Sequence, residues 1–148
     1  MPKEDFRFHH TLRVRWGECD AQGIVFNAQY LNFVEVAQAE YFRNLGVLLY
    51  DKQSRKHFDV ATVTAKLDFL APARVDDMLR IYMRVSKIGN TSIRVLVEIH
   101  RQASEELLTT GELVYVTYNS DEGKSRPMPV DVRDLITRFE ELNLSSPG

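Results

Sequence analysis

The feature that most constrains the fold is a long helical segment with apolar residues around most of its circumference. It is expected to span residues 27–45, because Asn27 is a favourable N-cap and Gly46 stands where a C-cap glycine is common. Its apolar residues are Tyr30, Leu31, Phe33, Val34, Val36, Ala37, Ala39, Tyr41, Phe42 and Leu45. Since these side chains cannot all face one neighbouring layer, we expect the helix to be buried on several sides.

Strand-like segments precede and follow this helix in the sequence. Apolar and polar residues alternate over residues 6–16, before the helix, and Trp16 ends the apolar face of that segment. Four more strand-like segments follow it, at residues 61–69, 79–85, 93–99 and 107–118, and the first three of them alternate between apolar and polar residues. A last amphipathic helix is expected over residues 130–142. This order predicts an α+β fold, in which a largely antiparallel sheet of about five strands wraps around one long central helix.

Composition and length exclude several classes of protein. The 148 residues are expected to form a single domain, 1–148, with a substantial core. The net charge of −2 gives no general attraction for nucleic acids or anionic membranes. The first residues are too charged for a secretory signal, and no apolar run approaches the ~20 residues of a membrane span. One cysteine, Cys19, cannot form an intrachain disulfide, so the cytoplasm is the expected compartment.

The segment that suggests specific chemistry connects the first strand to the helix and reads Asp20-Ala21-Gln22-Gly23-Ile24-Val25-Phe26-Asn27. A carboxylate beside a helix start can attack a carbonyl or activate water, while backbone N–H groups hold the developing oxyanion. Gly23 allows a positive φ and a close approach of the backbone to a ligand. Asp20 is therefore a candidate nucleophile or general base, although an Asp in a tight connector also commonly forms an Asx-turn.

These residues resemble the hotdog-fold acyl-CoA thioesterases, in particular the 4-hydroxybenzoyl-CoA thioesterase group. The signature of that family is an aspartate, two residues, a glycine, two aliphatic residues, an aromatic residue, and then a polar or aromatic residue. Residues 20–27 match this signature at every position, and the likeness extends from about Thr11 to Asp134, with Tyr30 and Phe33 in the helix. The resemblance implies that the chain hydrolyses an acyl-CoA thioester without a metal or redox cofactor.

The resemblance also implies roles for individual residues. Asp20 takes the place of the catalytic carboxylate, and Asn27 takes the place whose backbone N–H polarises the thioester carbonyl. Gly23 belongs to the same catalytic segment, and the aromatic Phe26 is expected to contact the substrate. Three cations are candidates for the phosphates of coenzyme A, namely Lys87, Lys124 and Arg126.

A partner subunit is part of the same expectation. The resemblance implies sheets paired edge to edge in a homodimer or homotetramer, with active sites at the subunit interface. The run Leu113-Val114-Tyr115-Val116 is apolar on both faces, which is typical of a strand covered on both sides.

Other functions remain open at this point. A hotdog hydroxyacyl-thioester dehydratase would need a histidine paired with a carboxylate at the helix, and no histidine occupies residues 20–27. A non-catalytic acyl-CoA-binding protein is the alternative outside enzymes. Cys19 as nucleophile would need a base within reach. Glu35 is interpreted as a structural carboxylate bonded to a buried partner, and His57 as a solvated loop residue. The acyl group itself is not determined by the sequence.

Overall fold

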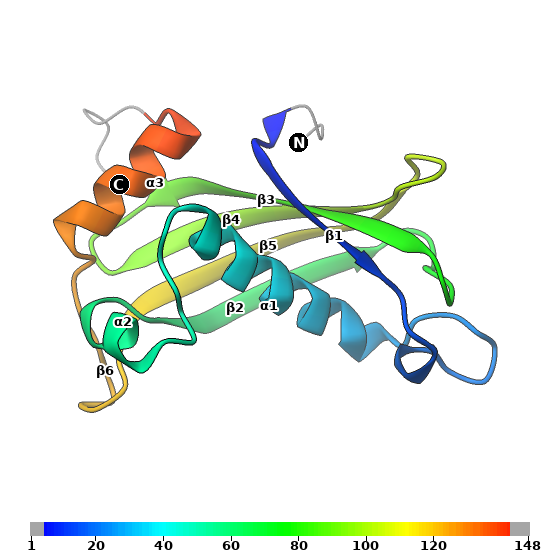
Figure 1. Cartoon of the computed structure of the whole chain (residues 1–148), viewed down its shortest axis with the longest axis horizontal. Helices are drawn as coiled ribbons and strands as arrows, with labels where there is room; N and C mark the ends of the chain where they lie inside the picture. Colours follow the sequence, from blue (N-terminus) through cyan, green and yellow to red (C-terminus); the bar gives the residue numbers. More distant parts are fainter. Residues whose placement is uncertain (1–4, 143–148) are drawn as a thin grey trace.

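The computed structural model describes residues 5–142 and consists of a curved antiparallel sheet with a long helix lying in its trough (Figure 1). The elements, in chain order, are β1 (Phe8–Arg13), the 3-10 turn η2 (Trp16–Glu18), α1 (Asn27–Asn44), α2 (Lys52–His57), β2 (Val60–Phe69), β3 (Met78–Ile88), β4 (Ser92–Arg101), β5 (Leu107–Asn119), β6 (Lys124–Ser125) and α3 (Val130–Glu140). The predicted α+β order of strand, helix, four strands and helix is confirmed.

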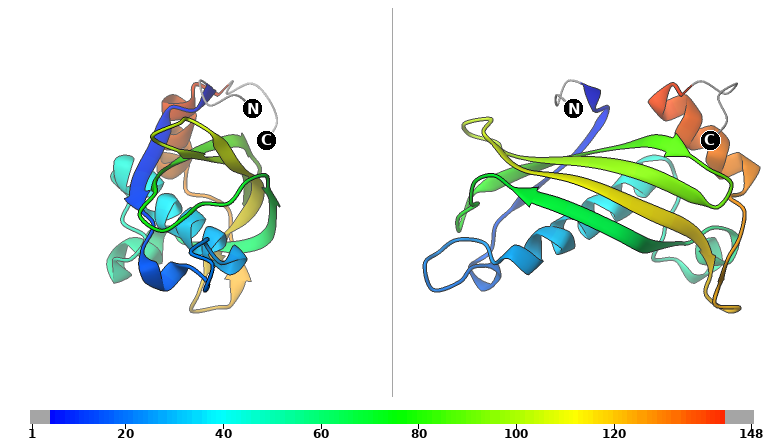
Figure 2. Two further views of the ribbon diagram at one scale, coloured as in Figure 1. Left: turned by 90° about the vertical axis from the view of Figure 1, so that its right-hand side faces the viewer. Right: turned by 180° about the vertical axis from the view of Figure 1, so that it is seen from behind.

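The sheet has the strand order β1-β3-β4-β5-β2, with every pair antiparallel and with β6 added to the end of β5. β1 and β2 are therefore its two edges. Seen end-on, the sheet curls around α1 (Figure 2). The alternation in the strands explains this arrangement, because one face of each strand carries the residues that pack beneath the helix. These inward residues include Leu79, Ile81, Met83, Val85, Ile93, Val95, Val97, Ile99, Leu113 and Tyr115.

The helix α1 is covered on one side only. Its buried residues are Tyr30, Phe33, Val34, Ala37, Gln38, Tyr41 and Phe42. By contrast, Leu31 and Val36 are 37% and 45% exposed. The expectation of burial on several sides is thus not met within one chain, because a single curved sheet covers only part of the circumference.

The ends of α1 differ slightly from the prediction. Phe26 is the N-cap, since it has an extended backbone, and Asn27 is the first helical residue. The C-terminal end is as expected. Gly46 has a φ of +85°, its N–H donates to the Arg43 carbonyl at 2.9 Å, and the Val47 N–H donates to the Phe42 carbonyl at 2.8 Å. These two bonds form a Schellman motif, which explains why a glycine ends this helix.

The alternation predicted Trp16 at the end of the first strand. In the structure Trp16 lies outside β1 and is 69% exposed. β1 ends at Arg13, and the chain then closes the turn η2. The buried Glu18 drives this change. Its carboxylate accepts the Arg15 backbone N–H at 2.7 Å and the Arg15 guanidinium at 2.6 Å, which fixes a tight turn where the alternation alone would continue a strand.

One carboxylate of α3 connects this helix to the rest of the fold. Glu140 of α3 accepts the Tyr41 hydroxyl at 2.5 Å and the Val85 N–H at 2.9 Å, so it ties α3 to both α1 and β3. Burial raises the pKa of the Glu140 carboxyl, although both hydrogen bonds oppose that effect.

Among residues 5–142, no helix has the length and apolar character needed to cross a membrane.

Candidate active site

The segment before α1 folds back on itself and brings Asp20 near the start of the helix. Cys19 and Val25 form an antiparallel bridge, the Asp20 N–H donates to the Ile24 carbonyl at 2.9 Å, and the Phe26 N–H donates to the Glu18 carbonyl at 3.1 Å. Strand geometry then leaves the backbones of Asp20 and Asn27 about 10 Å apart.

The reversal between Asp20 and Ile24 depends on Gly23. Its φ is +78°, and its N–H donates to the Asp20 carbonyl at 3.0 Å. An ideal Cβ on this residue would meet no atom within 4 Å, so backbone conformation and not space selects glycine here. Within residues 20–27, Gly23 is the residue whose backbone conformation disfavours any side chain.

The Asp20 carboxylate is exposed to solvent, and one of its two oxygens takes part in the turn. Its Oδ1 accepts the Gln22 N–H at 2.8 Å, which is the Asx-turn that a short Asp connector commonly forms. Within the described residues, its other oxygen has no hydrogen-bond partner. The structural role and a chemical role are therefore compatible, because they use different oxygens of one side chain.

The first turn of α1 has backbone N–H donors without an acceptor. Asn27 and Ala28 are the first two helical residues, whose N–H groups have no acceptor within a helix. Within residues 5–142 neither donates to another backbone carbonyl, whereas the next N–H, that of Gln29, donates to Phe26 at 2.8 Å. Free N–H groups at the positive end of the helix dipole favour a developing negative oxygen.

An open groove of about 780 Å³ starts beside this turn and runs along the exposed side of α1. Its lining residues are Leu12, Arg13, Arg15, Glu18, Gln29, Asn32, Phe33, Glu35, Val36 and Ala39. Asp20 and Asn27 do not line it, but Glu18 and Gln29, each two residues away from one of them, do. In a single chain, both candidate catalytic residues are therefore exposed and lie outside the lining of the groove.

The three cations predicted for the phosphates lie at the other end of the molecule. Lys87 is near the end of β3, and Lys124 is on β6, next to α2 and beyond the C-terminal end of α1 (Figure 1). The 18 residues of α1 separate the two ends by about 27 Å. Within one chain, these cations and the Asp20 carboxylate are thus not part of one site.

Arg126 is also engaged in holding α2. Its guanidinium donates to the carbonyls of Lys56 at 2.9 Å and Arg55 at 3.0 Å, which are otherwise unpaired at the end of that six-residue helix. A small basic pocket of about 190 Å³ surrounds it and includes Lys52, Arg55 and Lys56. A six-residue helix is too short to show a helical period, so the sequence alone does not indicate that these cations are neighbours of Arg126.

Comparison with known proteins identifies the family. The model of the thioesterase-like superfamily matches residues 14–136. The chain belongs to the thioesterase-like superfamily. It is 29% identical to the acyl-CoA thioester hydrolase YbgC of Escherichia coli, over 90% of this chain and 96% of that protein. It is 24% identical to the 1,4-dihydroxy-2-naphthoyl-CoA hydrolase of Synechococcus elongatus, over 89% and 95% of the two chains.

Solved structures of thioesterases share the fold of this thioesterase-like chain. The 1,4-dihydroxy-2-naphthoyl-CoA thioesterase of Synechocystis superposes with a TM-score of 0.79 at 24% identity, over 95% of this chain and 98% of that one. A thioesterase of Thermus thermophilus, complexed with coenzyme A and Zn, gives 0.80 at 25% identity, over 95% and 99%. These matches confirm the predicted hotdog fold, and the family confirms the predicted class of enzyme, a thioester hydrolase.

Three other residues considered from the sequence have different surroundings in this thioesterase-like protein. Burial raises the pKa of the Cys19 thiol, as do the nearby carboxylates of Asp20 and Glu18, so its environment disfavours the thiolate. Glu35 is half-buried and accepts the Thr62 hydroxyl at 3.3 Å, so its partner is an exposed hydroxyl and not the buried group expected. His57 is in α2 and pairs with Asp131 at 2.9 Å. Within residues 5–142, no three potential metal-binding side chains cluster together.

Proposed function

We propose that this protein hydrolyses acyl-CoA thioesters to a free acid and coenzyme A, with Asp20 and the start of α1 as its catalytic site. The observation that carries this proposal is the backbone reversal at residues 18–26, which leaves a solvent-facing carboxylate and the free N–H groups of Asn27 and Ala28 on one short folded segment. The family membership and the YbgC relative support the same activity.

Two routes satisfy this geometry. As a nucleophile, the Asp20 carboxylate attacks the thioester carbon, the C–S bond breaks to release the coenzyme A thiolate, and water then opens the mixed anhydride. As a general base, the carboxylate takes a proton from water, and the resulting hydroxide attacks the same carbon. In both routes the carbonyl oxygen becomes negative, and in this proposal the Asn27 N–H stabilises it. The coenzyme A sulfur leaves as thiolate and is protonated from solvent.

A second subunit would complete this site. The carboxylate lies near one end of α1 and the cations near the other, and the helix itself is about 27 Å long. One extended substrate therefore meets both groups most directly where two chains lie side by side. The edge strand β2 suits such pairing, because it has ten residues and is largely exposed. We propose a homodimer or a homotetramer of such dimers, in which Lys87, Lys124 and Arg126 contact the phosphates and Phe26, 58% exposed, contacts the acyl-pantetheine arm.

A substitution on the β2 edge tests this assembly. Val63 is 56% exposed and lies at the bulge between Thr62 and Thr64, so Val63→Asp should leave the single chain folded. Across a two-fold axis, however, the substitution places two carboxylates close together, and like charges at an edge oppose pairing. We expect monomers in light scattering and at least a 10-fold loss of kcat/KM. Val130→Asp, at a 72% exposed site on α3, is the matched control. A dimeric and active Val63→Asp variant would show that β2 is not the interface.

The proposed activity is tested by a hydrolysis screen with hydroxybenzoyl-CoA, dihydroxynaphthoyl-CoA and short- and medium-chain acyl-CoA substrates. We expect thiol release from at least one of these classes, at a rate typical of enzymes, with no added metal. The hydroxybenzoyl substrate tests the closer assignment to the 4-hydroxybenzoyl-CoA thioesterase group. Formation of an enoyl product from a hydroxyacyl-CoA would indicate the dehydratase, and tight binding without turnover would indicate the acyl-CoA-binding protein.

A further inference from the structure

We propose that Arg101, at the end of β4, is a positioning residue that holds the catalytic segment 20–27 in its active geometry. Arg101 does not belong to that segment and would not touch the substrate. It acts through the connection between β2 and β3, residues 70–77, which lies against the catalytic segment. The proposal rests on the function proposed above for Asp20 and Asn27.

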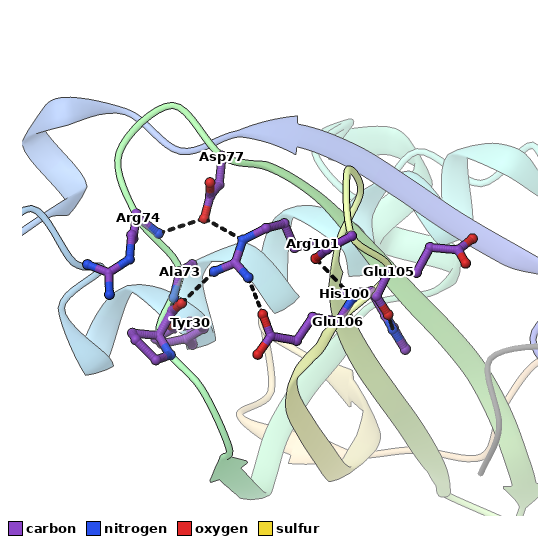
Figure 3. Close-up of polar contacts among 10 residues, drawn as sticks. Tyr30, Ala73, Arg74, Asp77, His100, Arg101, Glu105 and Glu106 are labelled. Carbon is purple, nitrogen blue, oxygen red and sulfur yellow. Dashed lines mark hydrogen bonds and ion pairs between the residues drawn. The ribbon is translucent and has the colours of Figure 1, made fainter.

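The guanidinium of Arg101 clamps both ends of this connection (Figure 3). Its Nε donates to Asp77 Oδ2 at 3.0 Å, and its Nη2 donates to the Pro72 carbonyl at 2.8 Å. Its Nη1 pairs with the carboxylate of Glu106 on the following hairpin loop. Asp77 Oδ2 also accepts the Arg74 N–H at 2.9 Å, so the same carboxylate closes the turn of the connection. The Arg101 side chain is only 20% exposed, which strengthens these charge-assisted bonds relative to surface pairs.

The clamped connection in turn holds the catalytic segment. The Val25 N–H donates to the Ala73 carbonyl at 2.9 Å, and the Val75 N–H donates to the Gly23 carbonyl at 3.1 Å. The Ala73 N–H donates to the buried hydroxyl of Tyr30 in the first turns of α1 at 3.0 Å. One short connection thus binds both the glycine turn and the helix start, which are the two parts that fix where Asp20 and Asn27 lie.

The connection needs an external clamp because its own conformation is unfavourable. Asp76 has a φ of +69°, a left-handed conformation that is less favourable for a residue with a side chain than for glycine. Arginine suits the clamp better than lysine, because a planar guanidinium can donate in three directions at once, to Asp77, Pro72 and Glu106. Loss of the clamp should let the connection and the catalytic segment shift, and a misplacement of about 1 Å at reacting groups can cost about 100-fold in rate.

The test compares Arg101→Gln and Arg101→Lys with the matched control Arg94→Gln. Arg94 lies on the same strand and pairs with Glu112 at 3.1 Å, but both side chains are about half exposed and far from residues 70–77. For Arg101→Gln we expect kcat to fall about 10- to 100-fold with KM within about 3-fold, since substrate contacts are kept. Arg101→Lys, which keeps the charge near Asp77 and preserves folding, should recover part of the loss. Arg94→Gln should match the wild type.

Amide hydrogen exchange supplies the readout that a general loss of stability would not give. In both Arg101 variants, we expect faster exchange at the Val25 and Val75 amides, with unchanged exchange in the centres of β3 and β4. Normal kcat together with wild-type exchange at these amides in Arg101→Lys and Arg101→Gln would overturn the proposal, as would exchange that rises equally everywhere. If the wild type released no thiol, the proposed function would fail, while the exchange at Val25 and Val75 would still decide whether Arg101 holds the segment.

Discussion

Replacing Asp20 by Asn is expected to lower kcat by about 100- to 10,000-fold while leaving the fold intact. The amide cannot act as a nucleophile or as a base toward water, and groups with either role typically contribute effects of this size. The fold should persist, because the Asn Oδ1 can still accept the Gln22 N–H and the side chain is exposed. Steady-state thiol release from the best acyl-CoA substrate measures the loss, and thermal unfolding checks the fold.

Asp131→Asn is the matched control for this variant. It makes the same isosteric change and removes the same charge from another exposed side chain, whose only described side-chain partner is His57 on α2. Turnover should therefore stay at the wild-type level. Near-normal turnover in Asp20→Asn would mean that the carboxylate takes no part in the chemistry and that the site has been assigned to the wrong residue.

Replacing Asn27 by Pro is expected to lower kcat by about 100- to 1000-fold, because it deletes the proposed oxyanion donor. Proline lacks a backbone N–H, and it is well tolerated at the first position of a helix. Asn27 occupies that position, and the preceding Phe26 has φ −67° and ψ 135°, an extended conformation that proline allows before it. The helix should therefore form as before, which circular dichroism and thermal unfolding can verify.

Asn27→Ala separates the backbone from the side chain at the same site. It removes the amide side chain but keeps the N–H, so we expect kcat within about 3-fold of the wild type, far from the loss typical of a missing oxyanion donor. If Asn27→Ala were as impaired as Asn27→Pro, the side chain would be the functional group. If Asn27→Pro retained full turnover, the oxyanion would have to be held elsewhere.

The local structure of this protein was largely predictable from its sequence. The alternation in β2 to β5 predicts strands because successive side chains point to opposite faces of a sheet, and Gly46 predicts the end of α1 because a Schellman motif needs a positive φ. The errors have local causes. Trp16 leaves the strand because Glu18 closes a turn, and α2 is too short to show a helical period. The main elements of the candidate site were predictable for the same reason, since Asp20, Gly23 and Asn27 lie within eight residues.

The features that could be predicted are those encoded by neighbours along the chain: the main elements, their order, and a carboxylate, a glycine turn and a helix start in one short segment. Which distant residues meet became clear only from the folded chain. It placed Lys87, Lys124 and Arg126 at the opposite end of α1 from Asp20, left one side of α1 open, and brought Arg101 to Pro72 and Asp77. The physical reason is that such contacts depend on how a twisted sheet curls around a helix, and pairs separated by tens of residues leave no periodic trace in the sequence.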